Sequence, residues 1–141
     1  MAKVLFTSQA TAKGGRDGHV TTPDHVLELE LAMPETPKAK KVEQSTNPEQ
    51  LFAAGYAACF DSALQLTAKK SRVKIETEVT AHVSLLKDEA DDGFKLGVRL
   101  QVKGTNIEKA ELEKLVDQAH QLCPYSKAIS GNVEVVLEVV S

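Results

Sequence analysis

The length, composition and charge of this sequence exclude several classes of protein. Its 141 residues fall within the roughly 100–200 expected of one domain, so we expect a single domain over residues 1–141. The formal net charge of -3 comes from interspersed acidic and basic residues, which disfavours a nucleic-acid partner. No window approaches about 20 apolar residues and no signal peptide is recognisable, so we expect a cytoplasmic protein with no membrane partner.

The first third of the chain predicts short strands joined by turns. A β-like run covers residues 3–12, and the glycines of residues 13–18, with Arg16 at the tip, permit a tight hairpin connection. A strand is expected over residues 26–31, where leucines alternate with glutamates. Residues 33–45 carry prolines and lysines without apolar periodicity, which predicts an exposed loop and the most mobile segment.

A central helix over residues 46–70 has a well-marked start. Asn47 suits the N-cap, Pro48 the first helical position, and Gln50 the partner position of a capping box. Small residues follow, so another helix or a strand could approach closely. We expect this helix to be largely buried and to carry Cys59 about three turns from its start. The predicted inward stripe consists of Leu51, Phe52, Gly55, Cys59, Ser62, Ala63 and Leu66.

The second half predicts a hairpin, a helix and a last strand. Alternating runs over residues 75–85 and 94–102, separated by a polar turn, form an antiparallel hairpin that should cover one side of the central helix. Thr105 and Glu108 make a capping box for a helix that ends at Cys123, because Pro124 disfavours helical geometry before it. A short connection over 124–131 leads to a strand over 133–139. Two helices and five or more mostly antiparallel strands predict an α+β fold.

The two cysteines are compatible with three uses: inert core thiols, metal ligands or redox chemistry. A lone Cys59 on an apolar stripe is more often a small core residue. Cys123, at a helix end beside proline, is expected to have solvent access and is better placed for reactivity. His120 lies on the same helical face, but the other histidines show no ligand spacing. We therefore expect no metal and interpret His120 as a surface residue.

Three segments together resemble organic hydroperoxide resistance proteins, which belong to the wider family of osmotically inducible protein C. The segments are Asn-Pro-Glu-Gln-Leu-Phe-Ala-Ala-Gly-Tyr-Ala-Ala-Cys-Phe at 47–60, Gly-Gly-Arg-Asp-Gly at 14–18 and Cys-Pro-Tyr-Ser at 123–126. The resemblance runs over nearly the full chain and implies an intertwined homodimer with two main helices against a mostly antiparallel sheet. It also implies a cofactor-free thiol peroxidase that reduces organic and lipid hydroperoxides to alcohols and is recycled by a dithiol, typically a lipoylated protein.

The resemblance also implies roles for four residues. Cys59 takes the place of the peroxidatic cysteine, Cys123 the resolving one, Arg16 the activating cation and Glu49 the anchor of that arginine. Without the resemblance, Arg16 reads as a solvated turn tip and Glu49 as a first-turn carboxylate. The chemistry independently requires a cation, because a free cysteine with a pKa of about 8.5 is little ionised at neutral pH. The helix dipole fades well before Cys59, so a guanidinium is the natural activating group.

The spacing of Glu49 and Cys59 predicts how such a site is assembled. Ten positions correspond to about 15 Å along one helix, too far for one guanidinium to touch both side chains. Two copies of the helix packed antiparallel near Gly55 would bring Cys59 of one subunit beside Glu49 of the other. We therefore predict composite active sites in a homodimer; unwinding or bending at Gly55 would instead let one chain supply both groups.

Other functions remain open at the level of sequence. A general thiol–disulfide oxidoreductase usually carries a Cys-x-x-Cys motif, which the wide separation of Cys59 and Cys123 disfavours. Phe52, Tyr56 and Phe60 are the candidate lining of a substrate pocket, and the same pocket would serve a non-enzymatic binding module. The osmotically inducible branch of the family is the closest alternative within the resemblance.

Overall fold

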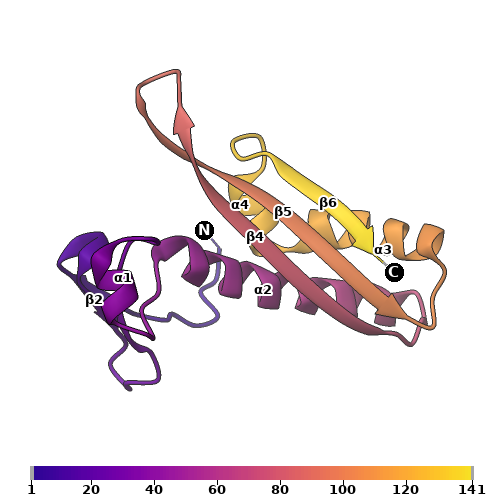
Figure 1. The fold of residues 1–141 in the computed structure, drawn as a ribbon. Coiled ribbons are helices and arrows are strands. Elements are labelled where there is room, and N and C mark those ends of the chain that lie inside the picture. The colour runs from indigo at the N-terminus through magenta and orange to yellow at the C-terminus, as the bar shows by residue number, and fades with distance from the viewer. Residues whose placement is uncertain (1, 141) are drawn as a thin grey trace. The chain divides into compact units, whose positions relative to one another are not determined.

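The computed structural model describes residues 2–140, and the chain divides into two compact units, residues 1–51 and 52–141 (Figure 1). The single domain expected over residues 1–141 stays a prediction. Both helices and strands are present, which confirms the α+β class. Between residues 2 and 140, no helix combines the length and the apolar character needed to cross a membrane.

The first unit contains a small antiparallel sheet of three strands in the order β1-β2-β3. These are β1 (Thr11–Lys13), β2 (His19–Thr21) and β3 (Glu28–Glu30). The predicted glycine hairpin joins the first two strands through a 3-10 turn, η1 (Gly15–Asp17). Gly14 and Gly15 have φ angles of 88° and 61°, and a Cβ on Gly18 would lie 1.8 Å from the Lys13 carbonyl oxygen. The turn that presents Arg16 therefore requires its glycines.

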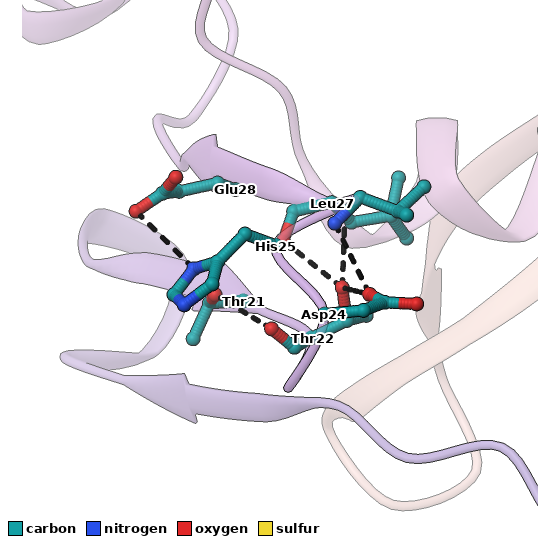
Figure 2. Close-up of polar contacts among 7 residues, drawn as sticks. Thr21, Thr22, Asp24, His25, Leu27 and Glu28 are labelled. Atoms are coloured by element: carbon teal, nitrogen blue, oxygen red, sulfur yellow. Dashed lines mark hydrogen bonds and ion pairs between the residues drawn. The ribbon is translucent and has the colours of Figure 1, made fainter.

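A second turn, between β2 and β3, is held by side-chain hydrogen bonds (Figure 2). The Thr22 hydroxyl donates to Asp24 Oδ1 at 2.7 Å and accepts the backbone N–H of Leu27 at 3.1 Å. Asp24 Oδ1 also accepts the N–H of Val26 at 3.1 Å. The hydrogen bonds from the Thr22 hydroxyl and the Val26 N–H lower the pKa of Asp24, the one from Thr22 most. Local polar side chains thus set the reversal of the chain.

The strand predicted over residues 3–12 is mostly wrong, because residues 2–10 have no regular structure and strand β1 begins only at Thr11. A strand requires a neighbour for its backbone groups, and residues 2–10 find none within the described chain. Val4, Leu5 and Phe6 are 72%, 84% and 82% exposed. The strand predicted over 26–31 is likewise shortened to β3, although Leu31 forms an isolated bridge with Thr46.

The expected loop over residues 33–45 contains a short helix, α1 (Pro37–Lys41). Thr36 is its N-cap and accepts the N–H of Ala39, and Pro37 occupies the first turn. A capping threonine followed by proline is a local helix start that apolar periodicity cannot reveal. The prediction of an irregular loop was therefore wrong for this part.

The central helix is confirmed as α2 (Pro48–Lys70). Asn47 Oδ1 accepts the backbone N–H of Gln50 at 2.8 Å, as an N-cap does. The capping box is not completed, because the Gln50 side chain contacts the Thr46 hydroxyl instead. The helix continues through Gly55 without interruption.

The inward face of α2 differs from the predicted stripe by about one residue. Leu66 is 47% exposed and Ser62 is also exposed, so the helix is less buried than expected. Small residues on several faces make the periodicity ambiguous, and the bulky aromatic side chains, which bury the most area, decide the orientation. The buried residues of α2 are Tyr56, Phe60, Ala63, Leu64, Thr67 and Ala68.

The second unit contains the larger sheet, in the order β4-β5-β6 (Figure 1). Strands β4 (Glu76–Asp88) and β5 (Gly93–Thr105) form the predicted hairpin, paired from Glu76 with Thr105 to Asp88 with Gly93. Strand β6 (Val135–Val140) lies parallel to β5, with Val98 opposite Val135. Alternate residues of β4 face inward, as expected of a half-buried strand.

Helices α3 (Lys109–Leu122) and α4 (Pro124–Ile129) connect β5 to β6. The predicted capping box is wrong: Glu108 is the N-cap of α3 and makes no side-chain cap. Asn106 has a φ of 61°, which turns the chain after Thr105 and delays the helix. The predicted end is confirmed, because Cys123 is extended with a ψ of 122° before Pro124. Helix α4 replaces part of the expected connection.

The core of the second unit lies between its sheet and helices α2 and α3. Residues from α2, β5 and α3 share one buried cluster, which places the hairpin against one side of α2 as predicted. Cys123 belongs to this cluster and Cys59 packs against it. The buried members are Tyr56, Phe60, Ala63, Leu64, Ala68, Val98, Leu100, Val102, Leu112, Leu115, Val116, Ala119 and Cys123.

Candidate active site

The two cysteines, which are 64 positions apart in sequence, face each other in the second unit. Cys59 comes from α2 and Cys123 from the junction of α3 and α4. Both are free thiols, and Cys123 Sγ donates to Cys59 Sγ over 3.6 Å. A disulfide needs about 2.05 Å between the sulfur atoms, so a small movement would join them.

The solvent access expected for Cys123 was wrong, because its side chain is fully buried. The chain does not leave the core after α3: Pro124 starts α4 at once, and the Lys127 N–H bonds to the Cys123 carbonyl at 2.9 Å. Cys59 is half-buried. Of the two thiols, Cys59 is therefore the one that a reagent can reach from outside.

The surroundings of Cys59 favour its protonated form. Burial raises the pKa of Cys59 above its ordinary value, and the hydrogen bond and charge of Cys123 raise it further. Among residues 2–140, the contribution that lowers this pKa is a hydrogen bond from the backbone of Tyr125. A thiolate at neutral pH therefore needs an additional positive group.

Aromatic side chains surround this part of α2. The Tyr125 ring lies 5.9 Å from that of Phe52 and 5.8 Å from that of Tyr56. It covers Gly55, where an added Cβ would lie 2.9 Å from the Tyr125 hydroxyl. Tyr56 and Phe60 are fully buried, whereas Phe52 is half-buried. The role of Phe52, Tyr56 and Phe60 in a substrate pocket stays a prediction.

A polar chain that the sequence did not suggest lies beside the thiols. The Tyr56 hydroxyl is 2.6 Å from Ser126 Oγ, and His120 Nδ1 is 2.8 Å from the same oxygen. His120 is half-buried, so its interpretation as a surface residue was wrong. The three residues come from three different helices. Spacing along one helix could not have revealed their contact.

Arg16 and Glu49 form an ion pair in the first unit. Arg16 Nη1 lies 2.5 Å from Glu49 Oε1, and Nη2 donates to Oε2 at 3.0 Å. The hydrogen bond to Glu49 raises the pKa of Arg16. This two-point geometry fixes the plane of the guanidinium and keeps one of its edges available.

Metal-ligating side chains do not cluster among the residues that the structure describes. Within residues 2–140, no group of three or more histidine, cysteine, aspartate or glutamate residues could hold a metal ion. The thiols and the ion pair are therefore the two chemically distinctive groupings that the sequence analysis singled out and that the structure assembles.

The fold agrees with the comparisons with known proteins. Residues 39–138 match the family described as OsmC-like protein, and the chain belongs to that family. It is 68% identical to the organic hydroperoxide resistance protein OhrA of Bacillus subtilis over 99% of both chains. It is 52% identical to OhrB of the same organism over 96% of this chain and 98% of that one. The crystal structure of OhrB covers 97% of this chain and 100% of its own with a TM-score of 0.92.

Proposed function

We propose that this chain is a cysteine-based peroxidase that reduces organic hydroperoxides to alcohols. The observation that carries the proposal is the approach of two free thiols to 3.6 Å, one half-buried and one fully buried. The names of OhrA and OhrB, both organic hydroperoxide resistance proteins, support an organic rather than an inorganic peroxide. The same names favour the organic hydroperoxide resistance branch of the family over the osmotically inducible branch.

The proposed reaction uses the two thiols in sequence. The Cys59 thiolate attacks the terminal peroxide oxygen, the O–O bond breaks, and the alkoxide takes a proton to leave as the alcohol. Cys59 is then a sulfenic acid. The Cys123 sulfur attacks the Cys59 sulfur, the thiol proton and the sulfenic OH leave as water, and a disulfide forms. An external dithiol, for which we propose a lipoylated protein, reduces the disulfide and restores both thiols.

Arg16 is proposed to activate Cys59, with Glu49 holding the guanidinium. Cys59 has a raised pKa and needs a cation, while the Arg16–Glu49 pair presents one with fixed orientation. Glu49 and Cys59 are ten positions apart in a helix that is not interrupted at Gly55, a rise of about 15 Å. We therefore propose that the cation comes from a second subunit.

A homodimer is part of this proposal. The apolar residues Val4, Leu5 and Phe6 are at least 72% exposed and lack a partner strand within the described chain, so a second copy could supply one. Ala54 and Ala58 of α2 are exposed and small, which suits close packing of a second helix. The predicted cytoplasmic location stays a prediction.

Anaerobic titration of the reduced protein with cumene hydroperoxide tests the proposed function. One equivalent should convert both thiols into the Cys59–Cys123 disulfide, with a loss of about 2 Da by intact mass, and hydrogen peroxide should react more slowly. Cys123→Ser should instead stop at the sulfenic acid. Two free thiols in the wild-type protein after consumption of peroxide would overturn the proposal.

A further inference from the structure

We propose that Tyr56, Ser126 and His120 form a positioning chain that holds Cys123 within reach of Cys59 for disulfide formation. This inference rests on the proposed peroxidase function and concerns its second step. The three residues are not reacting groups: they act through the placement of the turn that carries Cys123.

The geometry repeats the same spacing on both sides of the contact. Tyr56 and Cys59 are three positions apart on α2, and Ser126 lies in the first turn of α4, three positions after Cys123, which is the N-cap of that helix. Residues three apart on a helix lie on one face, and an N-cap residue lies next to the third residue of the first turn. The Tyr56–Ser126 contact of 2.6 Å and the Cys59–Cys123 contact of 3.6 Å therefore join the same two helical turns. Fixing the first contact restricts the second.

Ser126 is the member of the positioning chain that contacts both of the others. Its oxygen meets the Tyr56 hydroxyl at 2.6 Å and His120 Nδ1 at 2.8 Å, and a hydroxyl can serve both partners because it has one donor and two acceptor positions. Tyr56 is 0% and Ser126 2% exposed, so water cannot replace either contact cheaply. Burial raises the pKa of Tyr56, so its phenol stays protonated and can either donate to Ser126 Oγ or accept from it.

Helix α4 needs such an anchor because it has only six residues. A helix this short gains little from its own hydrogen bonds and depends on tertiary contacts. The same turn carries the buried Cys123 thiol and the Tyr125 backbone group that bonds to Cys59. Loosening the turn would displace the Cys123 thiol and weaken one hydrogen bond to Cys59. The second step should therefore suffer more than the attack of Cys59 on peroxide, which does not require Cys123.

The positioning chain affects the products of the reaction, because disulfide formation competes with further oxidation of Cys59. In the second step, Cys123 loses its proton, the Cys59 S–O bond breaks, the S–S bond forms and water leaves. If Cys123 is displaced, a second hydroperoxide can instead oxidise the sulfenic acid to the sulfinic acid. The positioning chain should therefore decide how Cys59 sulfenic acid is partitioned between these two products.

The test compares Tyr56→Phe and Ser126→Ala with the rescue variant Ser126→Thr, which keeps a hydroxyl. Rapid mixing of Ser126→Ala with cumene hydroperoxide should leave the rate of sulfenic acid formation within about twofold of the wild-type rate. Tyr56→Phe is judged by the fate of the sulfenic acid alone, because Tyr56 is also a candidate pocket residue. Loss of one buried hydrogen bond should slow disulfide formation about tenfold and raise the sulfinic acid fraction by a similar factor. Ser126→Thr should restore the wild-type partition.

A matched control separates positioning from general stability. Thr67 is a buried hydroxyl of α2 whose partner is the Ala63 carbonyl at 2.8 Å, with no link to α4. Thr67→Val should lower the melting temperature without changing the partition. The inference is overturned if Tyr56→Phe and Ser126→Ala give the same ratio of disulfide to sulfinic acid as Thr67→Val and the wild-type protein.

A second readout does not depend on peroxidase activity. Equilibration with dithiothreitol measures the effective concentration of the Cys59–Cys123 pair, which should fall about tenfold in Tyr56→Phe and not in Thr67→Val. An unchanged effective concentration in folded Tyr56→Phe would contradict the positioning chain. Failure of the wild-type protein to form any disulfide with peroxide would overturn the proposed function instead, so the two failures are distinguishable.

Discussion

The two groupings of the candidate site differ in how completely one chain builds them. The thiol pair lies in the second unit, where Cys123 belongs to the buried core cluster and Cys59 packs against it. The Arg16–Glu49 pair lies in the first unit, on a glycine turn and the first turn of α2. The thiol pair contains the candidate nucleophile, Cys59, whose pKa is raised. The ion pair contains the positive charge of Arg16.

This difference shows what each region lacks. Burial shields Cys123 from solvent, and partial burial of Cys59 disfavours the thiolate on which the proposed reaction depends. A guanidinium held at two points by a carboxylate retains donors for a second anion. Under the proposed function, each grouping supplies what the other lacks, and several variants test that relation.

The largest effect is expected from the thiols themselves. Cys59→Ser should lower the rate of organic hydroperoxide reduction at least about a thousandfold, because serine is not an effective nucleophile toward peroxide. Cys123→Ser should keep the first turnover and then lose activity through over-oxidation of Cys59. Stopped-flow peroxide consumption with intact-mass analysis measures both. Sustained turnover by Cys123→Ser, without added thiol, would show that Cys123 is not the resolving residue.

Removing the cation should have the next largest effect. Arg16→Ala should raise the Cys59 pKa, and a rise of one to two units would slow the reaction about tenfold to a hundredfold at neutral pH. Its rate should then climb as pH rises, since the thiolate fraction grows, whereas the wild-type rate should be nearly flat. Arg16→Lys should recover only part of the rate. An Arg16→Ala variant with an unaltered thiolate titration would mean that another group activates Cys59.

The smallest effect concerns the start of α2, which belongs to the ion-pair region. Asn47→Ala removes the hydrogen bond that Asn47 Oδ1 accepts from Gln50 and should cost about 1 kcal/mol of stability. Chemical denaturation measures this loss, with Asn47→Asp as a control that keeps the cap. Disulfide formation by Cys59 and Cys123 should be unaffected, because neither thiol depends on that cap. A changed ratio of disulfide to sulfinic acid in Asn47→Ala would show that the thiol pair depends on the ion-pair region, contrary to this account.

Local signals in the sequence were enough for the helix start at Asn47 and Pro48 and for the break at Pro124. Each depends on one or two residues and their own backbone. The hairpin of β4 and β5 was also predictable, because alternation continues on both sides of a polar turn. The three-helix contact of Tyr56, Ser126 and His120 was not predictable, since it depends on how separate helices pack.

Two predictions from the sequence, the exposure of Cys123 and the strand over residues 3–12, are wrong for the same physical reason. Solvent access was expected for Cys123 from its helix end, but tertiary packing and α4 bury it. A strand was expected over residues 3–12 from residue preference, but strands also need a partner, and residues 2–10 have none among the residues that the structure describes. Residue preference and apolar periodicity are properties of one segment. Side-chain burial and strand pairing depend on the parts of the protein that surround that segment.

Complementation between subunits tests most directly whether the thiol pair of one copy meets the ion pair of another. Cys59→Ser and Glu49→Ala homodimers should each be impaired. Their mixed dimer should regain one intact site, because the first subunit supplies Arg16 and Glu49 and the second supplies Cys59 and Cys123. Activity of the purified mixed dimer near half that of the wild type is the predicted result. A mixed dimer no more active than the Glu49→Ala homodimer would contradict a composite site.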